Sequence, residues 1–354
     1  MKKLLAAALT SIGLLTGTQS YAADIELTLA HSWPKGFPIF GTSVDDYAAM
    51  VSEMSDGRIE IKVDSRNKHK SAFGIFDFVK TGQYDIGQSA SYYYGGKEPD
   101  ALFFTTMPFG MTALEQYAWF HEGGGLELAN QVFEKHDIEV MTGGNTTMQM
   151  GGWFRKEINS IEDLKGLKMR IPGFGGKVLA GVGAVPTNIP AGELFQALER
   201  GTIDALEWVG PSLDLRMGFH KVAPFYYTGW HEPSTELMYF FNKSTMESLP
   251  AWARSTLLNA AKLTGFNMTV QSQHESAQNW ATMKNEFPNI VVKNFPEDVI
   301  SALRQSNAAL IEKEKSRSAL AAQIIQSQSD YLATVRRWTE IGDWSYLANV
   351  ANNK

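Results

Sequence analysis

A carboxylate stands beside an indole in the stretch RGTIDALEWVGP, where the pattern otherwise predicts a buried strand. Glu207 interrupts the apolar run Ala205–Val209, and Trp208 follows it directly. Burying a carboxylate costs free energy unless a partner compensates its charge. That partner can be a metal ion or the cation of a structural salt bridge, and the stretch itself leaves both open.

Other polar side chains stand at the ends of predicted strands. Arg170 ends the strand LKMR, and its planar guanidinium can bind a carboxylate through two parallel hydrogen bonds. Gln149 lies between two methionines in TTMQMGG and offers an amide oxygen. A surface arginine or an internal salt bridge explains Arg170 as well, and an exposed strand position explains Gln149. The run Tyr92–Tyr94 either packs in the core or turns one face towards a cleft.

The motifs of common enzymes are missing from this sequence. It has no cysteine and no G-x-S-x-G motif, and none of its seven histidines has the H-E-x-x-H spacing of zinc proteases. The pair His231-Glu232 lacks the second histidine, and PGFGGKV lacks the first glycine and the Ser or Thr of a phosphate-binding loop. We therefore expect no enzymatic activity. The alternative is an exported hydrolase that uses Glu207 as a general base.

Strand and helix patterns alternate along most of the chain. Extended segments such as IELTLAHSW and RIEIKVDS are separated by amphipathic helices, the first with its apolar stripe between Phe40 and Met54. This alternation is typical of parallel α/β units. From Leu249 the pattern becomes helical, with long segments over Asp298–Lys315 and Ala319–Thr339. Because no linker separates the α/β blocks, we predict two lobes joined by crossing strands, with a central cleft of the kind that binds ligands.

The N-terminal segment predicts an exported protein. Two lysines precede an apolar run over residues 4–15, which is too short to span a bilayer, and SYA at residues 20–22 fits a signal-peptide cleavage site. We expect cleavage after Ala22 and a periplasmic location. Loss of the two lysines takes the formal charge from −6 to −8, which argues against nucleic acid or an anionic membrane as a partner.

Four longer stretches resemble the solute-binding proteins of TRAP (tripartite ATP-independent periplasmic) transporters. They are SYYYGGKEPDALFFTTMPFGM, QMGGWFRKEINSIEDLKGLKMRIPGFGGKVL, AGELFQALERGTIDALEWVGP and GFHKVAPFYYTGWHEP. The resemblance is to the branch that binds 2-oxoacids and 2-hydroxyacids with a metal cation. It implies an α/β, two-lobed periplasmic-binding-protein fold (type II-like) with a central cleft and long C-terminal helices.

The resemblance also implies roles for the polar residues. Arg170 would clamp the carboxylate of a ligand such as pyruvate, 2-oxobutyrate or a lactate-like 2-hydroxyacid. Gln149, Glu207 and the backbone carbonyl of Trp208 would hold Na⁺ or Ca²⁺, hard cations that prefer oxygen ligands. The expected site residues are Arg170, Gln149, Tyr94, Asn145 and Trp208 for the ligand, and Gln149, Glu207, Trp208 and Glu232 for the cation.

The same resemblance implies partners and lobe boundaries. Membrane permease subunits would receive the ligand, and a homodimer would form through a C-terminal helix, for which 319–339 is the candidate. We expect lobe I to comprise 23–147 with part of 235–280, lobe II to comprise 148–234, and a helical region to follow over 281–354. A sensor protein of this fold, which presents its ligand to a receptor, shares every site residue and is the other alternative.

Two segments depart from the family pattern. DSRNKHKSAFGIFDFV replaces a more apolar segment of the Gly-Glu-x-Val-Pro kind, and Ser212 and Leu213 stand where Tyr-Asp is more common. We expect these departures to affect the far end of the ligand, so the sequence leaves the particular carboxylate open.

Overall fold

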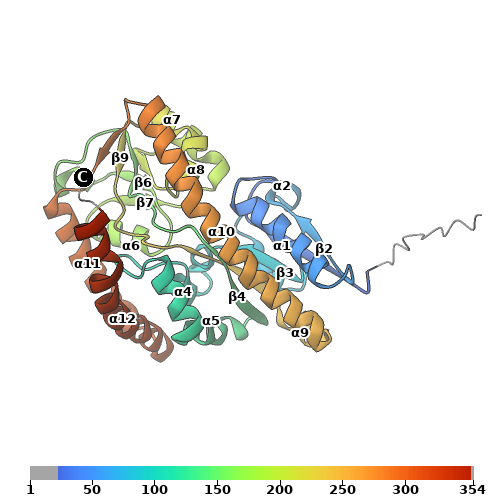
Figure 1. The fold of residues 1–354 in the computed structure, drawn as a ribbon. Coiled ribbons are helices and arrows are strands. Elements are labelled where there is room, and N and C mark those ends of the chain that lie inside the picture. Colours follow the sequence, from blue (N-terminus) through green and yellow to red (C-terminus); the bar gives the residue numbers. More distant parts are fainter. Residues whose placement is uncertain (1–22, 352–354) are drawn as a thin grey trace, which may run out of the picture.

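Two β-sheets form the centres of two lobes in the computed structural model of the chain (Figure 1). The structure describes residues 23–351, so the expected signal peptide and its cleavage site lie outside the described residues. Along the described part, none of the helices combines the length and the apolarity that crossing a membrane would need.

The first sheet has five strands in the order β2-β1-β3-β10-β4. β1 runs parallel to β2 and β3, whereas β10 runs antiparallel to β3 and β4. All seven residues of β10 are buried, because this strand lies inside the sheet with side chains packed on both faces. The strands are β1 (Ile25–His31), β2 (Ile59–Asp64), β3 (Ile86–Ser89), β4 (Ile138–Asn145) and β10 (Glu236–Asn242).

The second sheet has six short strands in the order β11-β9-β5-β8-β6-β7. β6 runs parallel to β7 and β8, and β5 runs antiparallel to β8 and β9. The strand expected over Ala205–Val209 is only two residues long, and Glu207 comes directly after it. The strands are β5 (Gly152–Phe154), β6 (Lys168–Arg170), β7 (Val185–Thr187), β8 (Ala205–Leu206), β9 (Phe225–Tyr227) and β11 (Val291–Lys293).

Helices cover both sheets, and several begin at the residues that the sequence indicates. Ser318 caps the helix that follows it by accepting a hydrogen bond from the backbone N–H of Ala321, and this helix has the predicted bounds Ala319–Thr339. The helices are α1 (Phe40–Met54), α2 (Arg66–His69), α3 (Ile75–Lys80), α4 (Ala113–Glu122), α5 (Gly125–Glu134), α6 (Gly173–Gly181), α7 (Leu194–Glu199), α8 (Pro211–Met217), α9 (Lys243–Ser248), α10 (Ala251–Glu286), α11 (Glu297–Lys315) and α12 (Ala319–Thr339).

The chain passes between the sheets along three segments. Residues 146–151 lead from β4 to β5, residues 228–235 lead from β9 to β10, and α10 runs across both lobes (Figure 1). α10 packs on α1 and β4 in the first lobe and on α8 in the second. Gly265 allows the close approach to β4, since a Cβ there would lie 3.0 Å from the backbone nitrogen of Gly144.

Candidate functional site

The ends of two parallel strands bring Arg170 and Glu207 together. Arg170 is the last residue of β6, and Glu207 follows β8, which pairs with β6 in parallel. The backbone N–H of Glu207 donates to the carbonyl oxygen of Arg170 at 3.0 Å. The carboxyl ends of parallel strands are where ligand sites form in α/β folds. Both side chains are almost fully buried, with 1% of Arg170 and 0% of Glu207 exposed.

Arg170 is the direct partner of Glu207. Its Nη1 donates to the backbone carbonyl oxygen of Glu207 at 2.6 Å and to Glu207 Oε2 at 3.0 Å. Its Nε donates to the carbonyl oxygen of Ile189 at 3.3 Å, and the indole of Trp208 lies 5.2 Å from the guanidinium carbon. These bonds do not use the Nη2 group, so that edge of the guanidinium can meet a further acceptor. A surface position for Arg170 is excluded.

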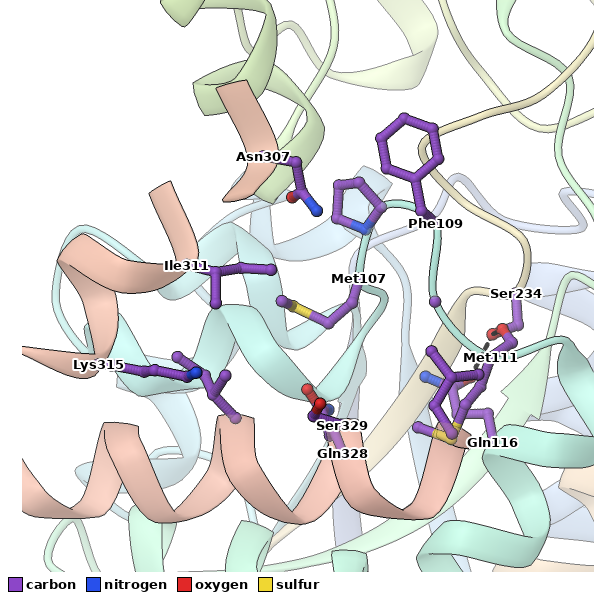
Figure 2. Close-up of a pocket in the computed structure, with 14 residues that line it drawn as sticks. Met107, Phe109, Met111, Gln116, Ser234, Asn307, Ile311, Lys315, Gln328 and Ser329 are labelled. Atoms are coloured by element: carbon purple, nitrogen blue, oxygen red, sulfur yellow. Dashed lines mark hydrogen bonds between the residues drawn. The ribbon is translucent and has the colours of Figure 1, made fainter. Parts of the chain in front are cut away.

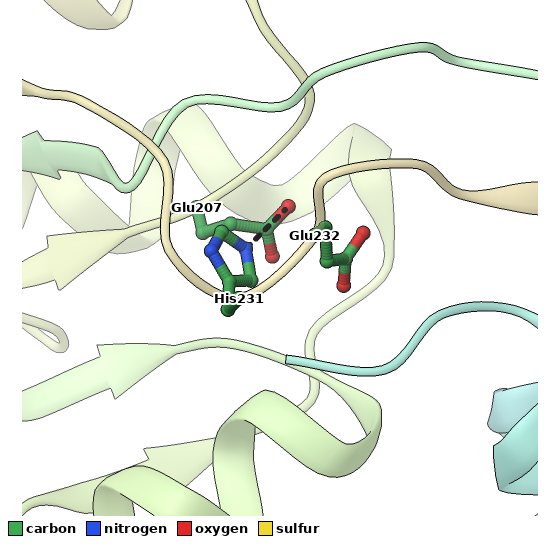
Figure 3. Close-up of side chains that lie close together, drawn as sticks. All are labelled: Glu207, His231 and Glu232. Carbon is green, nitrogen blue, oxygen red and sulfur yellow. Dashed lines mark ion pairs between the residues drawn. The ribbon is translucent and has the colours of Figure 1, made fainter. Parts of the chain in front are cut away.

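Glu207 is also part of a buried cluster with His231 and Glu232 (Figure 3). One nitrogen or oxygen atom from each of the three residues lies within 4.8 Å of the others, and His231 Nε2 is 3.9 Å from Glu207 Oε1. Glu232 Oε2 accepts a hydrogen bond from Thr235. Glu207 Oε1, Glu232 Oε1 and both ring nitrogens of His231 have no hydrogen-bond partner among the described residues.

Gln149, which is bonded to the backbone of Glu232, carries a further unpartnered oxygen. Its backbone N–H donates to the carbonyl oxygen of Glu232 at 3.0 Å, and its Nε2 donates to Thr146 Oγ1 at 2.9 Å. That bond fixes the amide, and Oε1 is left buried without a partner in the described structure. Buried polar atoms are nearly always hydrogen-bonded, so three unpartnered oxygens from Gln149, Glu207 and Glu232 are unusual. Together they suit a hard cation such as Na⁺ or Ca²⁺.

Burial also sets the charge states of the cluster. It raises the pKa of Glu207 to about 7, although the charge of Arg170 opposes the shift. Burial and the charge of Glu207 raise the pKa of Glu232 to about 7 as well. Burial lowers the pKa of His231 to about 4, so its imidazole is neutral at neutral pH. With both carboxylates ionised, Arg170 balances only one of the two negative charges.

Two expected ligand contacts lie outside this cluster. Tyr94 stacks on Phe76 with ring centroids 5.3 Å apart and meets Phe240 edge-on, so its ring packs in the core of the first lobe. The side chain of Asn145 is fully hydrogen-bonded: Nδ2 donates to Gln116 and Glu236, and Oδ1 accepts from the backbone N–H groups of residues 147 and 235. Asn145 therefore ties the crossing segments together.

Tyr92 and Tyr93 are the tyrosines that approach Arg170. The charge of Arg170 acts on both phenols, opposing the rise in pKa that burial causes in each. Residues 91–94 form a 3-10 helix. In such a helix successive side chains are rotated by about 120°, whereas in a strand they would alternate between two faces. Tyr94 therefore points into the core while its neighbours face the site. The tyrosine run was visible in the sequence, whereas His231 gave no signal beyond its neighbour Glu232.

Residues of the first lobe close over the site. The rings of Phe37 and Phe40 lie 6.2 and 6.1 Å from that of Trp208. Gly173, at a left-handed φ of 62°, faces Tyr92 so closely that a Cβ would come within 2.3 Å of the ring. Arg66 lies in the first of the two segments that differ from the family pattern, and it forms an ion pair of 3.1 Å with Glu193 of the second lobe. The second of these segments includes Ser212 and Leu213, which are buried at the start of α8.

Comparison with known proteins agrees with this geometry. The family model for bacterial extracellular solute-binding protein, family 7 (DctP), matches residues 29–317. A curated relative from Nostoc, named a monocarboxylate 2-oxoacid-binding periplasmic protein, is 32% identical over 96% of this chain and 95% of its own length. Two crystal structures of TRAP periplasmic solute-binding proteins are each 55% identical, with a TM-score of 0.91, over 92% of this chain and 99% of theirs. The protein from Colwellia psychrerythraea holds calcium and pyruvate, and that from Pseudoalteromonas atlantica holds sodium and pyruvate.

These matches confirm the predicted two-lobed fold and the predicted family, whose members are the binding subunits of transporters and not enzymes. The chain belongs to the bacterial extracellular solute-binding proteins of family 7 (DctP), and is a solute-binding protein of the TRAP transporter type.

Proposed function

We propose that this protein binds a small 2-oxoacid, with pyruvate as the first candidate, together with Ca²⁺ or Na⁺, and delivers it to membrane permease subunits. The observation that carries the proposal is the set of unpartnered, buried oxygens of Gln149, Glu207 and Glu232 beside Arg170. The cation would take these three oxygens and the backbone carbonyl of Trp208. The Nη2 edge of Arg170 would bind the ligand carboxylate.

The charges of the site give a reason for the cation. When Glu207 and Glu232 are both ionised, their two negative charges outnumber the single positive charge of Arg170. An anionic ligand entering such a buried site would meet a net negative charge, which is strongly unfavourable in a medium of low dielectric constant. A bound Na⁺ would bring the net charge of the site to zero and a bound Ca²⁺ would make it positive, so the oxoacid and the cation should bind cooperatively.

The burial of the site supports a small ligand. Arg170, Glu207, His231 and Glu232 are each at most 1% exposed, and aromatic rings of the first lobe pack over Trp208. Such an enclosed site favours a small ligand. The pyruvate found in the two crystal structures at 55% identity is of this size and supports the same ligand class.

Calorimetry with defined cations tests the proposal. The mature protein, stripped of metal with a chelator, is titrated with pyruvate, 2-oxobutyrate, lactate and, as a control without a 2-oxygen, propionate. Each titration is done in potassium buffer with no added cation, with Na⁺ and with Ca²⁺. We expect tight binding of the 2-oxoacids only when the cation is present, and pyruvate recovered unchanged after incubation. Equal affinity with and without cation would contradict the proposed site, and consumption of pyruvate would favour an enzyme.

We further propose a periplasmic location after cleavage behind Ala22 and a homodimer formed through the C-terminal segment. The first half of α12 packs on its own lobe, where Ala321, Ile324 and Ile325 are buried. The apolar surface lies further on, with Trp338 69% exposed and Ile341 73% exposed. Trp344, Tyr346, Leu347 and Val350 are exposed as well. A continuous stretch of exposed large apolar side chains marks an interaction surface.

A short truncation tests this surface without removing the packed part of α12. A chain that ends at Thr339 should run as a monomer in light scattering, whereas the full mature chain should run as a dimer. The variant Met54→Lys changes an exposed apolar residue at the end of α1 and serves as the control that should stay dimeric. A full-length chain that is monomeric at micromolar concentration would end the proposal, and mass spectrometry of the secreted protein tests the cleavage site.

A further inference from the structure

A cavity of about 190 Å³ lies between α11, α12 and the loop 107–111, away from the Arg170 cluster (Figure 2). Its walls are largely apolar and include Met107 and Met111 from the loop and Ile311 from α11. A volume on the order of 150 Å³ is enough to hold a molecule the size of benzene. The flexible thioether side chains of methionine adapt to different occupants. The cavity therefore has the size and the lining to hold a small organic molecule.

Two buried amide side chains line this cavity and lack hydrogen-bond partners. Asn307 of α11 and Gln328 of α12 are each only 7% exposed. Gln328 Nε2 donates to the carbonyl oxygen of Phe103 at 2.7 Å, which fixes the orientation of its amide. Gln328 Oε1 and Asn307 Oδ1 are buried, and neither accepts a hydrogen bond from any described residue. Figure 2 shows the side chain of Asn307 directed from α11 towards the loop.

The lining excludes a cationic occupant. It contains no Asp or Glu, and its one charged member is Lys315, whose Nζ is paired with Glu312 Oε1 at 3.0 Å. A cationic occupant would lie near the Lys315 ammonium, and no carboxylate in the lining would balance the charge of the occupant. The fixed Oε1 of Gln328 can only accept a hydrogen bond, so the occupant must supply a donor.

We propose that this cavity is a second binding site, which takes a small uncharged molecule with an apolar body and a hydroxyl or N–H donor. The donor bonds to Gln328 Oε1, the amide of Asn307 gives a second polar contact, and the body packs between the methionines and Ile311. The site does not depend on the ligand of the Arg170 cluster.

The site also adjoins the segments that join the lobes. Ser234, in the second crossing segment, lines the cavity. Its single hydroxyl proton can be donated to the carbonyl oxygen of Met111, 2.8 Å away, or to Gln116 Oε1, 2.9 Å away. Gln116 Oε1 also accepts from Nδ2 of Asn145, at the end of β4. An occupant of this cavity would therefore contact Ser234, which lies on the second crossing segment, and Gln116, which is bonded to Ser234 and Asn145.

Two isomeric probes test the proposal. Benzyl alcohol and anisole have the same atoms, but only the alcohol carries a donor. The mature protein, labelled with ¹³C-methyl methionine and saturated with pyruvate and Ca²⁺, is titrated with each probe by NMR. We expect saturable shifts of the Met107 and Met111 methyl signals, and none of Met246, which is buried in another cluster. Benzyl alcohol should bind about fivefold more tightly than anisole, as one neutral hydrogen bond implies.

Variants identify the contacts. Gln328→Met removes the acceptor with little change of volume and should abolish the preference for the alcohol. Ile311→Phe adds bulk from a half-buried position and should weaken both probes at least tenfold. Pyruvate titrations of each variant show whether it is folded, and if Gln328→Met is not, Asn307→Leu takes its place with a reduced preference expected. The absence of a saturable shift at Met107 and Met111, equal affinities in the unchanged protein, or a preference that survives loss of the acceptor would each overturn the proposal.

Discussion

The substitution Glu207→Gln separates a cation ligand from a structural salt-bridge partner. Gln keeps the size of the side chain and an oxygen, and it can still accept the bond that Arg170 Nη1 now donates to Oε2 at 3.0 Å. It removes the negative charge and one of the three unpartnered oxygens of Gln149, Glu207 and Glu232. If Glu207 holds a cation, the affinity for the cation should fall, and the affinity for the oxoacid should fall with it.

The size of the effect follows from the charge that is lost. Two unit charges about 4 Å apart interact by about 4 kcal/mol at an effective dielectric constant of about 20. Because desolvation offsets part of this, we expect a loss of about 2–4 kcal/mol, or roughly 30- to 1,000-fold in the Kd of the cation. The cation strengthens oxoacid binding by the same factor by which the oxoacid strengthens cation binding. If Glu207→Gln weakens the coupling between the two ligands, this factor should therefore shrink in both measurements.

Isothermal titration of pyruvate, with and without Ca²⁺, measures this factor in both proteins. The matched control is Glu236→Gln, which removes another fully buried carboxylate whose pKa burial raises to about 7. Glu236 accepts hydrogen bonds from the backbone N–H groups of Gly143 and Gly144 and lies outside the cluster. The control should lower Tm and keep the dependence on cation. A Glu207→Gln protein that keeps the full effect of Ca²⁺ would show that the cation binds elsewhere.

Three further outcomes are expected. Arg170→Lys should weaken pyruvate binding at least tenfold in calorimetry, about 1.4 kcal/mol, because one ammonium cannot bond to Glu207 and present a second planar edge to the ligand; unchanged affinity would remove this residue from the site. Gly173→Ala should weaken pyruvate at least tenfold, since the added Cβ meets the Tyr92 ring at 2.3 Å in the closed form; binding at the original affinity would contradict this closure. Burial would raise the pKa of Glu115, but hydrogen bonds from Arg336 and others lower it. In thermal melts, the unchanged protein should therefore be more stable than Glu115→Gln, with the full difference above about pH 5 and a falling difference below about pH 4. A difference that does not depend on pH would contradict this role of the Glu115 carboxylate.

Local signals predicted much of the fold. α12 has the bounds expected from its periodicity. The sequence SIEDL has the pattern of a capping box, with Asp163 in place of Glu, and the structure has this capping box at Ser160. The prediction of a strand over Ala205–Val209 was wrong beyond Leu206, where β8 ends. The apolar residues of the stretch 205–209 are buried because they pack between the lobes. An apolar run shows that residues are buried, but it does not show whether their backbone is hydrogen-bonded to a neighbouring strand.

The candidate site was predictable where one residue was anomalous in its own segment. Glu207 stood out because a carboxylate is costly inside an apolar strand, and Arg170 because it ended one. Tyr94 was expected to contact the ligand, but its ring packs in the core, because residues 91–94 form a 3-10 helix for which the sequence gave no signal. His231 was missed because its burial arises from the packing of a crossing segment against α6, a contact between distant parts of the chain.

The positions of the proposed cation ligands also indicate the order of binding. Gln149 and Glu232 lie on the two crossing segments, which are bonded to each other at 3.0 Å from the N–H of Gln149 to the carbonyl oxygen of Glu232. Glu207 directly follows β8 of the second sheet, so the proposed oxygen ligands do not require the first lobe. That lobe supplies the rings that cover the site, among them Tyr92 opposite Gly173. The proposed cation site can therefore exist before the lobes close, and closure would then enclose the oxoacid. Gly173→Ala should on this basis leave the affinity for Ca²⁺ alone unchanged while it weakens pyruvate, and an equal loss of both would show that the cation also requires the closed form.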